Sequence, residues 1–411
     1  MAEPKIRFKG YNDEWVVSSY CEIAKSFKYG LNACAISFDG MNKYLRITDI
    51  DDDTRCFIQS QLTTPGIDLS FADEYLLQDG DITFARTGAS VGKSYIYHKY
   101  DGKAYFAGFL IRMQTIDSVS PDFVFQNSLT SRFLNHIKIV SQRSGQPGVN
   151  TNELKAYELL IPDSLAEQQQ IASCFKSLDT LIQSTTKKIA TLKQLKSASL
   201  VSMFPQIGER KPRVRFKGFK EDWKVKKLCE ISKKVTTKNR ELKYNITLTN
   251  SAECGIISQL DFFNHEISNN HSISSYYVVE NDDFVYNPRI SATAPVGPIS
   301  RNRLGYTGVM SPLYYVFKVY DIDNDYLSYF FQTRIWHKYM FDNGNSGARF
   351  DRLSITDDIF GKMPIISPTD LAEQRQIASF FRSLDTQISL ETQRLEKLKQ
   401  IKSACLDKMF V

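Results

Sequence analysis

The sequence predicts an α+β protein in which two globular domains with mixed sheets are separated by two long helices. Three observations lead to this prediction. The 411 residues are 42% hydrophobic, which is enough for folded cores and too much for a disordered chain. Two conserved segments recur about 206 residues apart, and short strand-like stretches fill the remainder of each half. The chain is therefore expected to be a pseudo-two-fold internal repeat.

The repeat consists of two motifs in each half. Arg7-Phe8-Lys9-Gly10, with Trp15, recurs as Arg215-Phe216-Lys217-Gly218, with Trp223. Leu165-Ala166-Glu167-Gln168 recurs as Leu371-Ala372-Glu373-Gln374. Between residues 163–204 and 369–410, 24 of 42 positions are identical, whereas the segments before them differ along most of their length. Two copies with such a long period argue against a solenoid.

The repeated segments are predicted to be long helices, because their apolar residues alternate spacings of three and four over about four heptads. Pro162 with Ser164 and Glu167, and Pro368 with Asp370 and Glu373, have the spacing of a capped helix start, and Pro205 ends the first helix. The predicted seam of the helix pair consists of Ile171, Phe175, Leu178, Ile182, Ile189, Leu192, Ile377, Phe381, Leu384, Ile388, Leu395 and Leu398.

A single helix cannot bury such a stripe, so the two helices are expected to pair with each other. Parallel and antiparallel pairing are both compatible with the periodicity. The seam turns polar at Thr185 and Glu391. This layer could set the register of the pair, or it could be a solvated gap in the seam.

The variable segments are predicted to be mixed α and β, since apolar, β-branched and aromatic stretches alternate with turn signals. The expected strands are Tyr44–Ile50, Ile82–Ala85, Ser94–His98, Ala104–Met113, Thr247–Thr249, Ser275–Val279, Asp283–Tyr286 and Pro312–Val319. The expected helices are Pro121–Ile139 and Tyr326–Met340.

Cysteine and histidine patterns argue against metal and disulfide chemistry. The seven cysteines are scattered without a C-x-x-C pair, and the five histidines form no metal-binding spacing. No apolar run approaches 18 residues, and the first residues lack the apolar core of a secretory signal. A reducing cytoplasm is the expected location.

Two motifs come close to known catalytic patterns without matching them. Gly88–Ser94 resembles a phosphate-binding loop but has three residues between its glycines instead of four, so it is predicted to be an ordinary turn. Asn287-Pro288-Arg289 lacks the second proline and the aromatic residue of the motif that holds a flipped base in amino-methyltransferases. No catalytic residue and no metal site is predicted.

Taken together, the repeated order of variable segment and Leu-Ala-Glu-Gln helix resembles the specificity (S) subunit of type I restriction–modification systems. Further residues that carry the resemblance are Gly80-Asp81-Ile82, Phe84–Ala89 and Ser144–Asn150, with Leu159–Pro162 before the helix. The second half departs at Arg289, where the arginine turn of the first half is replaced by Asn287-Pro288-Arg289. The resemblance covers nearly the whole chain.

This resemblance implies a non-catalytic DNA reader, in which each variable segment is a target-recognition domain for one half of a bipartite site. The two helices would form an antiparallel coiled coil that sets the spacer and docks two methyltransferase subunits, with two restriction–translocase subunits in the full complex. S-adenosylmethionine, ATP and Mg²⁺ would be used by those partners, and no cofactor is expected in this chain. The protein would act on double-stranded DNA in the cytoplasm of a bacterium or archaeon, with no membrane partner. The implied domains are residues 1–162 and 214–367 as target-recognition domains, 163–204 and 368–411 as spacer helices, and 205–213 as a linker.

Polar and basic residues in glycine-rich turns are the expected DNA contacts, because arginine can bridge two acceptors of guanine and amides can bridge adenine. They are Arg86, Ser90, Lys93, Gln142, Arg143, Ser144, Gln146, Arg289, Arg301, Arg303, Asn345, Arg349 and Arg352. The net charge gives little support for DNA binding. The chain carries +6, but residues 1–162 hold 17 basic and 19 acidic side chains, so the first domain is slightly acidic. The positive charge of the first domain would have to be concentrated on one face, or partner subunits would supply much of the phosphate contact.

Two other classes of function remain open at this point. A coiled-coil scaffold with two protein-binding domains would share the helices, and a stand-alone nuclease or methyltransferase would need a degenerate active site. Binding to a defined split DNA site would exclude the scaffold, and activity of the chain without partners would support the enzyme.

Overall fold

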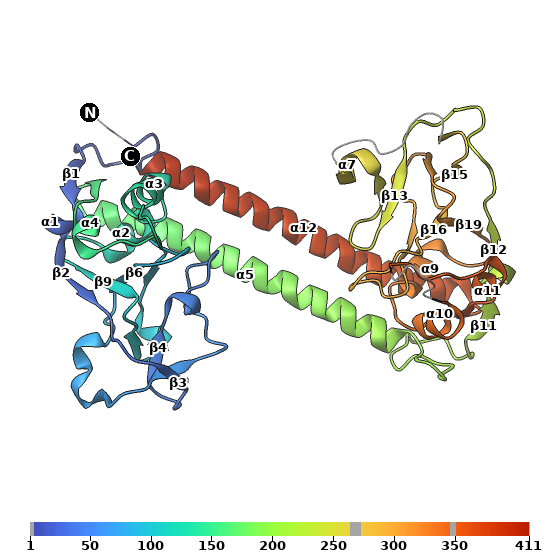
Figure 1. Ribbon diagram of the computed structural model, residues 1–411, viewed down its shortest axis with the longest axis horizontal. Coiled ribbons are helices and arrows are strands. Elements are labelled where there is room, and N and C mark those ends of the chain that lie inside the picture. Colours follow the sequence, from blue (N-terminus) through green and yellow to red (C-terminus); the bar gives the residue numbers. More distant parts are fainter. Residues whose placement is uncertain (1–3, 264–272, 346–350, 411) are drawn as a thin grey trace. The chain divides into compact units, whose positions relative to one another are not determined.

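The structure is a computed structural model that describes residues 4–263, 273–345 and 351–410. By its contacts the chain divides into two compact units (Figure 1). Unit 1 comprises Met1–Lys188 and Glu391–Val411, and unit 2 comprises Ile189–Leu390. The division falls within both long helices, α5 (Leu165–Met203) and α12 (Leu371–Met409), so each unit contains part of both.

Unit 1 is built on the four-stranded antiparallel sheet β2-β9-β6-β7, with two-stranded pairs β1-β10, β3-β5 and β4-β8 around it. The β4-β8 pair is parallel, so the strands of this unit are mixed, as expected. The strands are β1 (Val16–Ser19), β2 (Ala24–Tyr29), β3 (Ala35–Ser37), β4 (Lys43–Leu45), β5 (Thr63–Pro65), β6 (Ile82–Ala85), β7 (Ser94–Ile96), β8 (Ala104–Phe106), β9 (Leu110–Thr115) and β10 (Glu158–Ile161). The short helices are α1 (Tyr20–Ile23), α2 (Pro121–Asn127), α3 (Ser131–Val140) and α4 (Thr151–Lys155).

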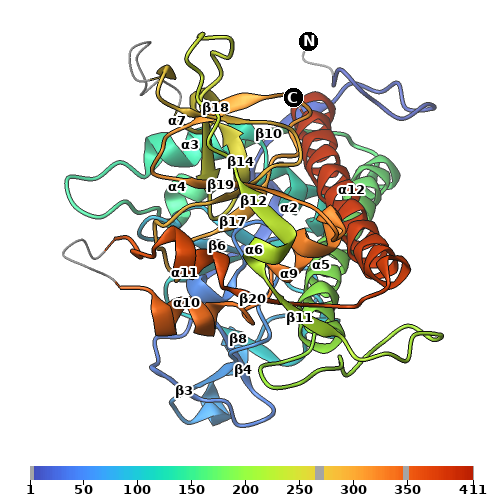
Figure 2. The same ribbon diagram turned by 90° about the vertical axis from the view of Figure 1, so that its right-hand side faces the viewer.

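Unit 2 repeats this plan, although its sequence is different (Figure 2). Its sheet has the order β12-β19-β16-β17, and the pairs are β11-β20, β13-β14 and β15-β18. The strands are β11 (Lys224–Lys227), β12 (Ser232–Lys234), β13 (Leu248–Ser251), β14 (Gly255–Ser258), β15 (Tyr277–Val279), β16 (Phe284–Tyr286), β17 (Ile299–Arg301), β18 (Gly308–Met310), β19 (Tyr315–Val319) and β20 (Pro364–Ser367). The short helices are α6 (Leu228–Ile231), α7 (Gln259–Phe263), α9 (Asn324–Phe330), α10 (His337–Asn343) and α11 (Asp357–Gly361).

Several expected elements are confirmed, and the following four are wrong in their extent. The expected helix Pro121–Ile139 is two helices, α2 and α3, because Thr130 leaves the helical conformation and its hydroxyl caps α3. Residues 326–340 likewise fall in two helices, α9 and α10. The expected strand Ala104–Met113 divides into β8 and β9 at Gly108, where the backbone turns. The strand expected at Tyr44–Ile50 ends at Leu45, and a single helical turn follows.

The repeated motifs are tied to one another inside each unit. In unit 1 the Arg7 guanidinium donates to both carboxylate oxygens of Glu167, at 2.7 and 2.9 Å, and in unit 2 Arg215 makes the same pair with Glu373, at 2.6 and 2.8 Å. Both carboxylates are buried, and a bidentate arginine is the partner that a buried carboxylate needs. The sequence pattern had suggested that Glu167 completes a capping box with Ser164. Ser164 does cap the helix, but the carboxylate is occupied by Arg7.

The glutamine of each Leu-Ala-Glu-Gln motif joins the start of its long helix to the start of a short one. Gln168 accepts from the amide of Ser120 and donates to the carbonyl of Pro162, both at 2.8 Å. Gln374 makes the equivalent bonds with Asp323 and Pro368, also at 2.8 Å. These contacts give a structural reason for the identity of the two motifs, because both glutamines are buried and each uses its amide oxygen and its amide nitrogen.

Segments of α5 and α12 lie side by side in each unit (Figure 1). In unit 1 the carboxylate of Asp179 binds Lys402 at 2.6 Å, and Glu391 binds Lys188 at 2.5 Å. In unit 2 Asp385 binds Lys196 at 2.6 Å. This pair is the counterpart of Asp179–Lys402, except that here the aspartate lies on α12 and the lysine on α5. Seven of the predicted seam residues are buried, namely Ile171, Phe175, Ile182, Ile189, Ile377, Phe381 and Leu384, and the other five, Leu178, Leu192, Ile388, Leu395 and Leu398, are half-buried.

The polar layer of the predicted seam contains one buried residue and one ion pair. Thr185 is buried. The pKa of Glu391 is lowered, chiefly by the hydrogen bond that its carboxylate accepts from Lys188. Since Lys188 lies on α5 and Glu391 on α12, sliding one helix along the other would break this pair. The role of this layer in setting the register stays a prediction.

The end of each long helix is anchored by a phenylalanine. Phe204, just after α5, packs on Trp223, Tyr326, Phe330 and Phe381 in unit 2. Phe410, just after α12, packs on Phe123 and Phe175 in unit 1. The core of unit 1 therefore includes the first turns of α5 and the last turn of α12, and the core of unit 2 includes the first turns of α12 and the last turn of α5.

A buried aspartate precedes the central strand β16 of unit 2 and gives a prediction for pH dependence. The carboxylate of Asp283 accepts from the Glu280 amide at 2.8 Å and lies 3.8 Å from the ammonium of Lys318. Burial raises the pKa of this carboxyl from 3.8 to about 6. Because the folded protein then holds the proton more tightly than the unfolded chain, the stabilisation is full below pH 3.8 and is lost as the pH rises through about 6.

The substitution Asp283→Asn should remove this dependence, because the amide keeps the acceptor for Glu280 and carries no charge. We expect the variant to be more stable than the parent at pH 7 and the difference to vanish near pH 4. Denaturant unfolding of the full chain between pH 4 and 8, with unit 2 followed by hydrogen exchange, measures it. A variant with the parent's slope between pH 4 and 7 would show that Asp283 does not titrate in this range.

Candidate nucleic-acid interface

In each unit the fold joins two turns that are about 60 residues apart in the sequence. In unit 1 the connection from β6 to β7 pairs with the loop after α3. A bridge links Thr87 to Gly148, and the amide of Val149 donates to the carbonyl of Arg86 at 2.8 Å. In unit 2 Arg289 and Arg352 form the equivalent bridge, and the amide of Leu353 donates to Pro288 at 2.9 Å. Residues chosen from separate glycine-rich turns are thus neighbours.

The structure places Arg86 and Gln146 on the same surface of unit 1. Both line a hollow of about 910 Å³ that Tyr29, Thr87 and Phe109 also border. Gln142, Arg143 and Ser144 are exposed on the adjoining loop, and Ser90 is half-buried in the turn. The guanidinium of Arg143 is already paired with the carboxylate of Glu153.

Lys93 is not on this surface, which corrects the sequence expectation. Its ammonium is buried, contacts Asp52 at 2.5 Å and donates to the carbonyl of Ile50 at 3.0 Å. Gly88 and Gly92 have positive φ, so the segment folds as a tight turn in which the amide of Lys93 bonds to Ser90. This geometry directs the lysine into the core of unit 1, where it supports the loop that carries Asp52.

In unit 2, Arg289 and Asn345 are exposed, and Arg352 is half-buried. Arg289 and Arg352 border a pocket of about 340 Å³ together with Asn287 and Tyr314. Both guanidinium groups lie about 4 Å from one carboxylate, that of Asp351 (3.9 and 4.0 Å), a distance too long for a strong ion pair. Arg349 lies outside the described residues.

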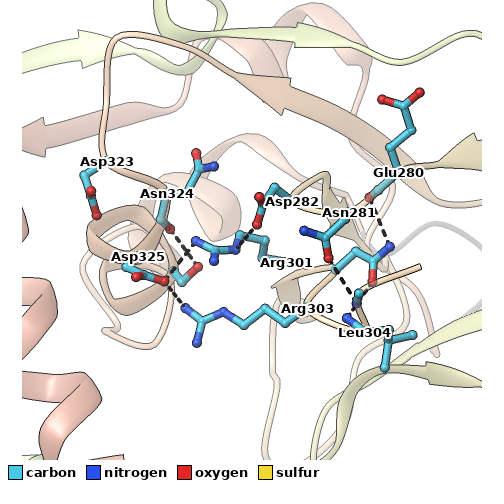
Figure 3. Close-up of polar contacts among 12 residues, drawn as sticks. Glu280, Asn281, Asp282, Arg301, Arg303, Leu304, Asp323, Asn324 and Asp325 are labelled. Atoms are coloured by element: carbon cyan, nitrogen blue, oxygen red, sulfur yellow. Dashed lines mark hydrogen bonds and ion pairs between the residues drawn. The ribbon is translucent and has the colours of Figure 1, made fainter. Parts of the chain in front are cut away.

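Arg301 and Arg303 belong to a different cluster, which also corrects the expectation (Figure 3). Arg301 lies 3.1 Å from Asp282 and 3.0 Å from Asp325, and Arg303 donates to Asp325 at 2.8 Å. Only 13% of the Arg301 side chain is exposed, and burial lowers the pKa of its guanidinium. Arg382 of α12 binds the second oxygen of Asp325 at 3.1 Å, so the cluster ties the sheet to α9 and α12. The charges of Arg301 and Arg303 are therefore paired with carboxylates of unit 2.

Sequence reasoning missed Tyr29 and Phe109, which border the hollow beside Arg86. The expected DNA contacts were polar and basic residues only. A signal was present, because Tyr29 immediately precedes Gly30 and Phe109 follows Gly108, and glycine-flanked aromatics at strand ends are often exposed. Phe109 is indeed exposed.

Within the part of the chain that the structure describes, no group of three or more histidine, cysteine, aspartate or glutamate side chains could hold a metal ion. The same residues include no helix that combines the length and the apolar character needed to cross a membrane.

The family model of the type I restriction modification DNA specificity domain matches the chain twice, over residues 12–194 and 220–400. The chain belongs to this family. Each match begins just after the Arg-Phe-Lys-Gly segment and ends in a long helix, so the family unit is one half of the repeat.

Relatives agree with this assignment. The type I restriction enzyme MjaVIII specificity subunit of Methanocaldococcus jannaschii is 22% identical over 356 residues, which cover 81% of this chain and 79% of that protein. A crystal structure of the S subunit of a type I restriction–modification system from M. genitalium superposes with a TM-score of 0.61 at 12% identity, covering 100% of this chain and 99% of that one.

A chain from a structural study of complex assembly and conformational transition in the type I system superposes with a TM-score of 0.52 at 14% identity, covering 97% and 98% of the two chains. These similarities establish the fold. The chain is thus a type I specificity subunit with a mixed α/β fold, and the resemblance inferred from its motifs is confirmed.

Proposed function

We propose that this chain is the non-catalytic DNA reader of a type I restriction–modification complex, in which each variable domain recognises one half of a bipartite site. The observation that carries the proposal is the double family match, with one copy of the specificity domain on each half of the chain. In each half, two polar turns meet at an edge of the unit and present unpaired or weakly paired arginines. Such turns suit contacts to the edges of base pairs.

We propose further that α5 and α12 form an antiparallel coiled coil that relates the two halves by a pseudo-two-fold axis. Three ion pairs support this proposal, since residues 179, 188 and 196 of α5 meet residues 402, 391 and 385 of α12 in reverse order. The exchanged pairs Asp179–Lys402 and Lys196–Asp385 are what a two-fold relation produces. In this proposal residues 163–204 and 368–411 are the spacer helices, 205–213 is the linker, and 1–162 and 214–367 are the target-recognition domains.

The paired helices would set the spacing of the half-sites and dock two methyltransferase subunits, and two restriction–translocase subunits would complete the assembly. S-adenosylmethionine would be bound by the methyltransferases, and ATP and Mg²⁺ by the translocases. The complex would work on double-stranded DNA in the cytoplasm of a bacterium or archaeon.

Domain exchange tests the independence of the two readers. Replacing residues 16–162 by the same segment of a relative with a different target should change one half-site and leave the other half-site and the spacer intact. The methylated sequences of a host that carries the chimera and the methyltransferase reveal the outcome. Replacing the equivalent segment of the second half is the matched control, and it should change the opposite half-site. A change of both half-sites by a single exchange would contradict independent reading.

A further inference from the structure

The hollow beside the paired turns of unit 1 contains a guanidinium group without a protein counter-charge. Arg86 borders the hollow, and its backbone is fixed on both sides by bonds to the carbonyl of Phe109 at 3.0 Å and from the amide of Val149 at 2.8 Å. Among the described residues, no carboxylate forms an ion pair with Arg86, and its Nε is buried without a hydrogen-bond partner. Leaving a partly buried charge unpaired costs stability, so an acceptor from outside the chain is the natural partner.

The side chain of Arg86 is also restrained by contact with an aromatic ring. Its guanidinium carbon lies 4.7 Å from the centre of the Tyr29 ring, a cation–π distance. The hydroxyl of Tyr29 in turn accepts from the amide of Thr151, at 3.3 Å, at the start of α4. Nε is buried, and among the described residues the two terminal amino groups form no hydrogen bond or ion pair, so they are the free donors. A planar pair of donors in a fixed orientation is preorganised for two acceptors that lie side by side.

Other cations near this surface are already neutralised. Arg46 borders the same hollow, but both oxygens of Asp49 accept from its guanidinium, at 2.8 and 2.7 Å. Arg143, on the adjoining loop, is paired with Glu153. Arg86 therefore differs from its neighbours in three ways. Its guanidinium contacts the Tyr29 ring, hydrogen bonds fix its backbone, and no carboxylate of the described residues neutralises its charge.

We infer that Arg86 determines specificity in the half-site read by unit 1, where it recognises a guanine through the O6 and N7 acceptors of the major-groove edge. The inference rests on the proposed DNA-reading function, and it names guanine as the base that unit 1 recognises through Arg86. Guanine is the base that presents two adjacent acceptors in the major groove. A phosphate contact would not require a restrained guanidinium, because a flexible lysine or an exposed arginine makes it equally well.

The test uses the full chain in complex with its methyltransferase subunits and the variants Arg86→Lys and Arg86→Ala. A library of duplexes varies each position of the half-site assigned to unit 1 by the domain exchange. The unsubstituted complex should prefer guanine at one position by on the order of 10- to 100-fold. Both variants should lose this preference while the other half-site and the spacer are unchanged. Arg86→Lys keeps the charge but not the planar pair of donors, so a loss in this variant is diagnostic.

Arg46→Lys is the matched control, because it alters an arginine that Asp49 already neutralises and should leave every base preference unchanged. The thermal unfolding of Arg86→Lys should match that of the unsubstituted chain, which separates a recognition effect from misfolding. An unsubstituted complex without any bipartite preference would overturn the proposed function itself. A preference that survives in Arg86→Lys, or uniformly weaker binding with a lower salt slope and an unchanged motif, would overturn the inference and leave the proposed function standing.

Discussion

Replacing Phe204 by alanine is expected to lower the free energy of unfolding of unit 2 by about 3–5 kcal/mol, the usual cost of removing a buried phenylalanine ring from a packed core. Phe204 is fully buried and packs on four aromatic rings, those of Trp223, Tyr326, Phe330 and Phe381. Its position in the sequence belongs to the first half of the repeat, yet its contacts belong to unit 2. The loss should therefore occur in the second reader.

Hydrogen exchange of the full chain, followed peptide by peptide, locates this loss. Phe204→Ala should accelerate exchange around residues 223–231, 324–331 and 371–385, and leave residues 119–140 protected. The matched variant Phe410→Ala should do the reverse, because Phe410 packs on Phe123 and Phe175 in unit 1. If Phe204→Ala loosened unit 1 instead, the assignment of the helix ends to the two cores would be wrong.

Lengthening both long helices by one heptad is expected to abolish modification at the original sites and to create modification at sites with a longer spacer. Seven residues add about 10.5 Å of helix, close to three base pairs of DNA at about 3.4 Å each. A heptad preserves the seam, since the apolar spacing of both helices continues across it. The insertions belong after Lys188 and after Leu390, where the division between the units falls.

A heptad inserted into α5 alone is the control for this experiment. It would shift Lys196 away from Asp385 while leaving Asp179 beside Lys402, so the two units could not both keep their helix contacts. We expect this variant to lose methylation without gaining a new spacer. Sequencing of methylated adenines in the host compares the variants, and an unchanged spacer in the double insertion would refute the role of the helices in spacing.

The sequence was most informative where a physical period or a repeat was present. The heptad stripe predicted both long helices, and the duplicated Glu-Gln motifs predicted their starts, because these features depend on local spacing. The family assignment followed from the order of the repeated parts. The split of residues 121–139 was missed because the apolar spacing continues across Thr130, whose hydroxyl accepts from the Phe133 amide and begins α3 as a new helix.

The candidate interface was harder to predict, since it depends on contacts between distant residues. Sequence reasoning grouped Arg86 with Gln146, which share one hollow, but also included Lys93 and Arg301, whose partners Asp52 and Asp325 lie in other segments. An arginine in a glycine-rich turn has the same local pattern whether it pairs with a carboxylate or faces solvent. Only the fold reveals which charges are compensated.

The most direct test of the account is the map of methylated adenines in cells that produce this chain together with its methyltransferase subunit and no other methyltransferase. The account predicts a single bipartite motif, with two specified half-sites separated by a spacer of fixed length and free sequence. A contiguous motif, or methylation without sequence preference, would contradict the conclusion that the chain holds two readers of DNA.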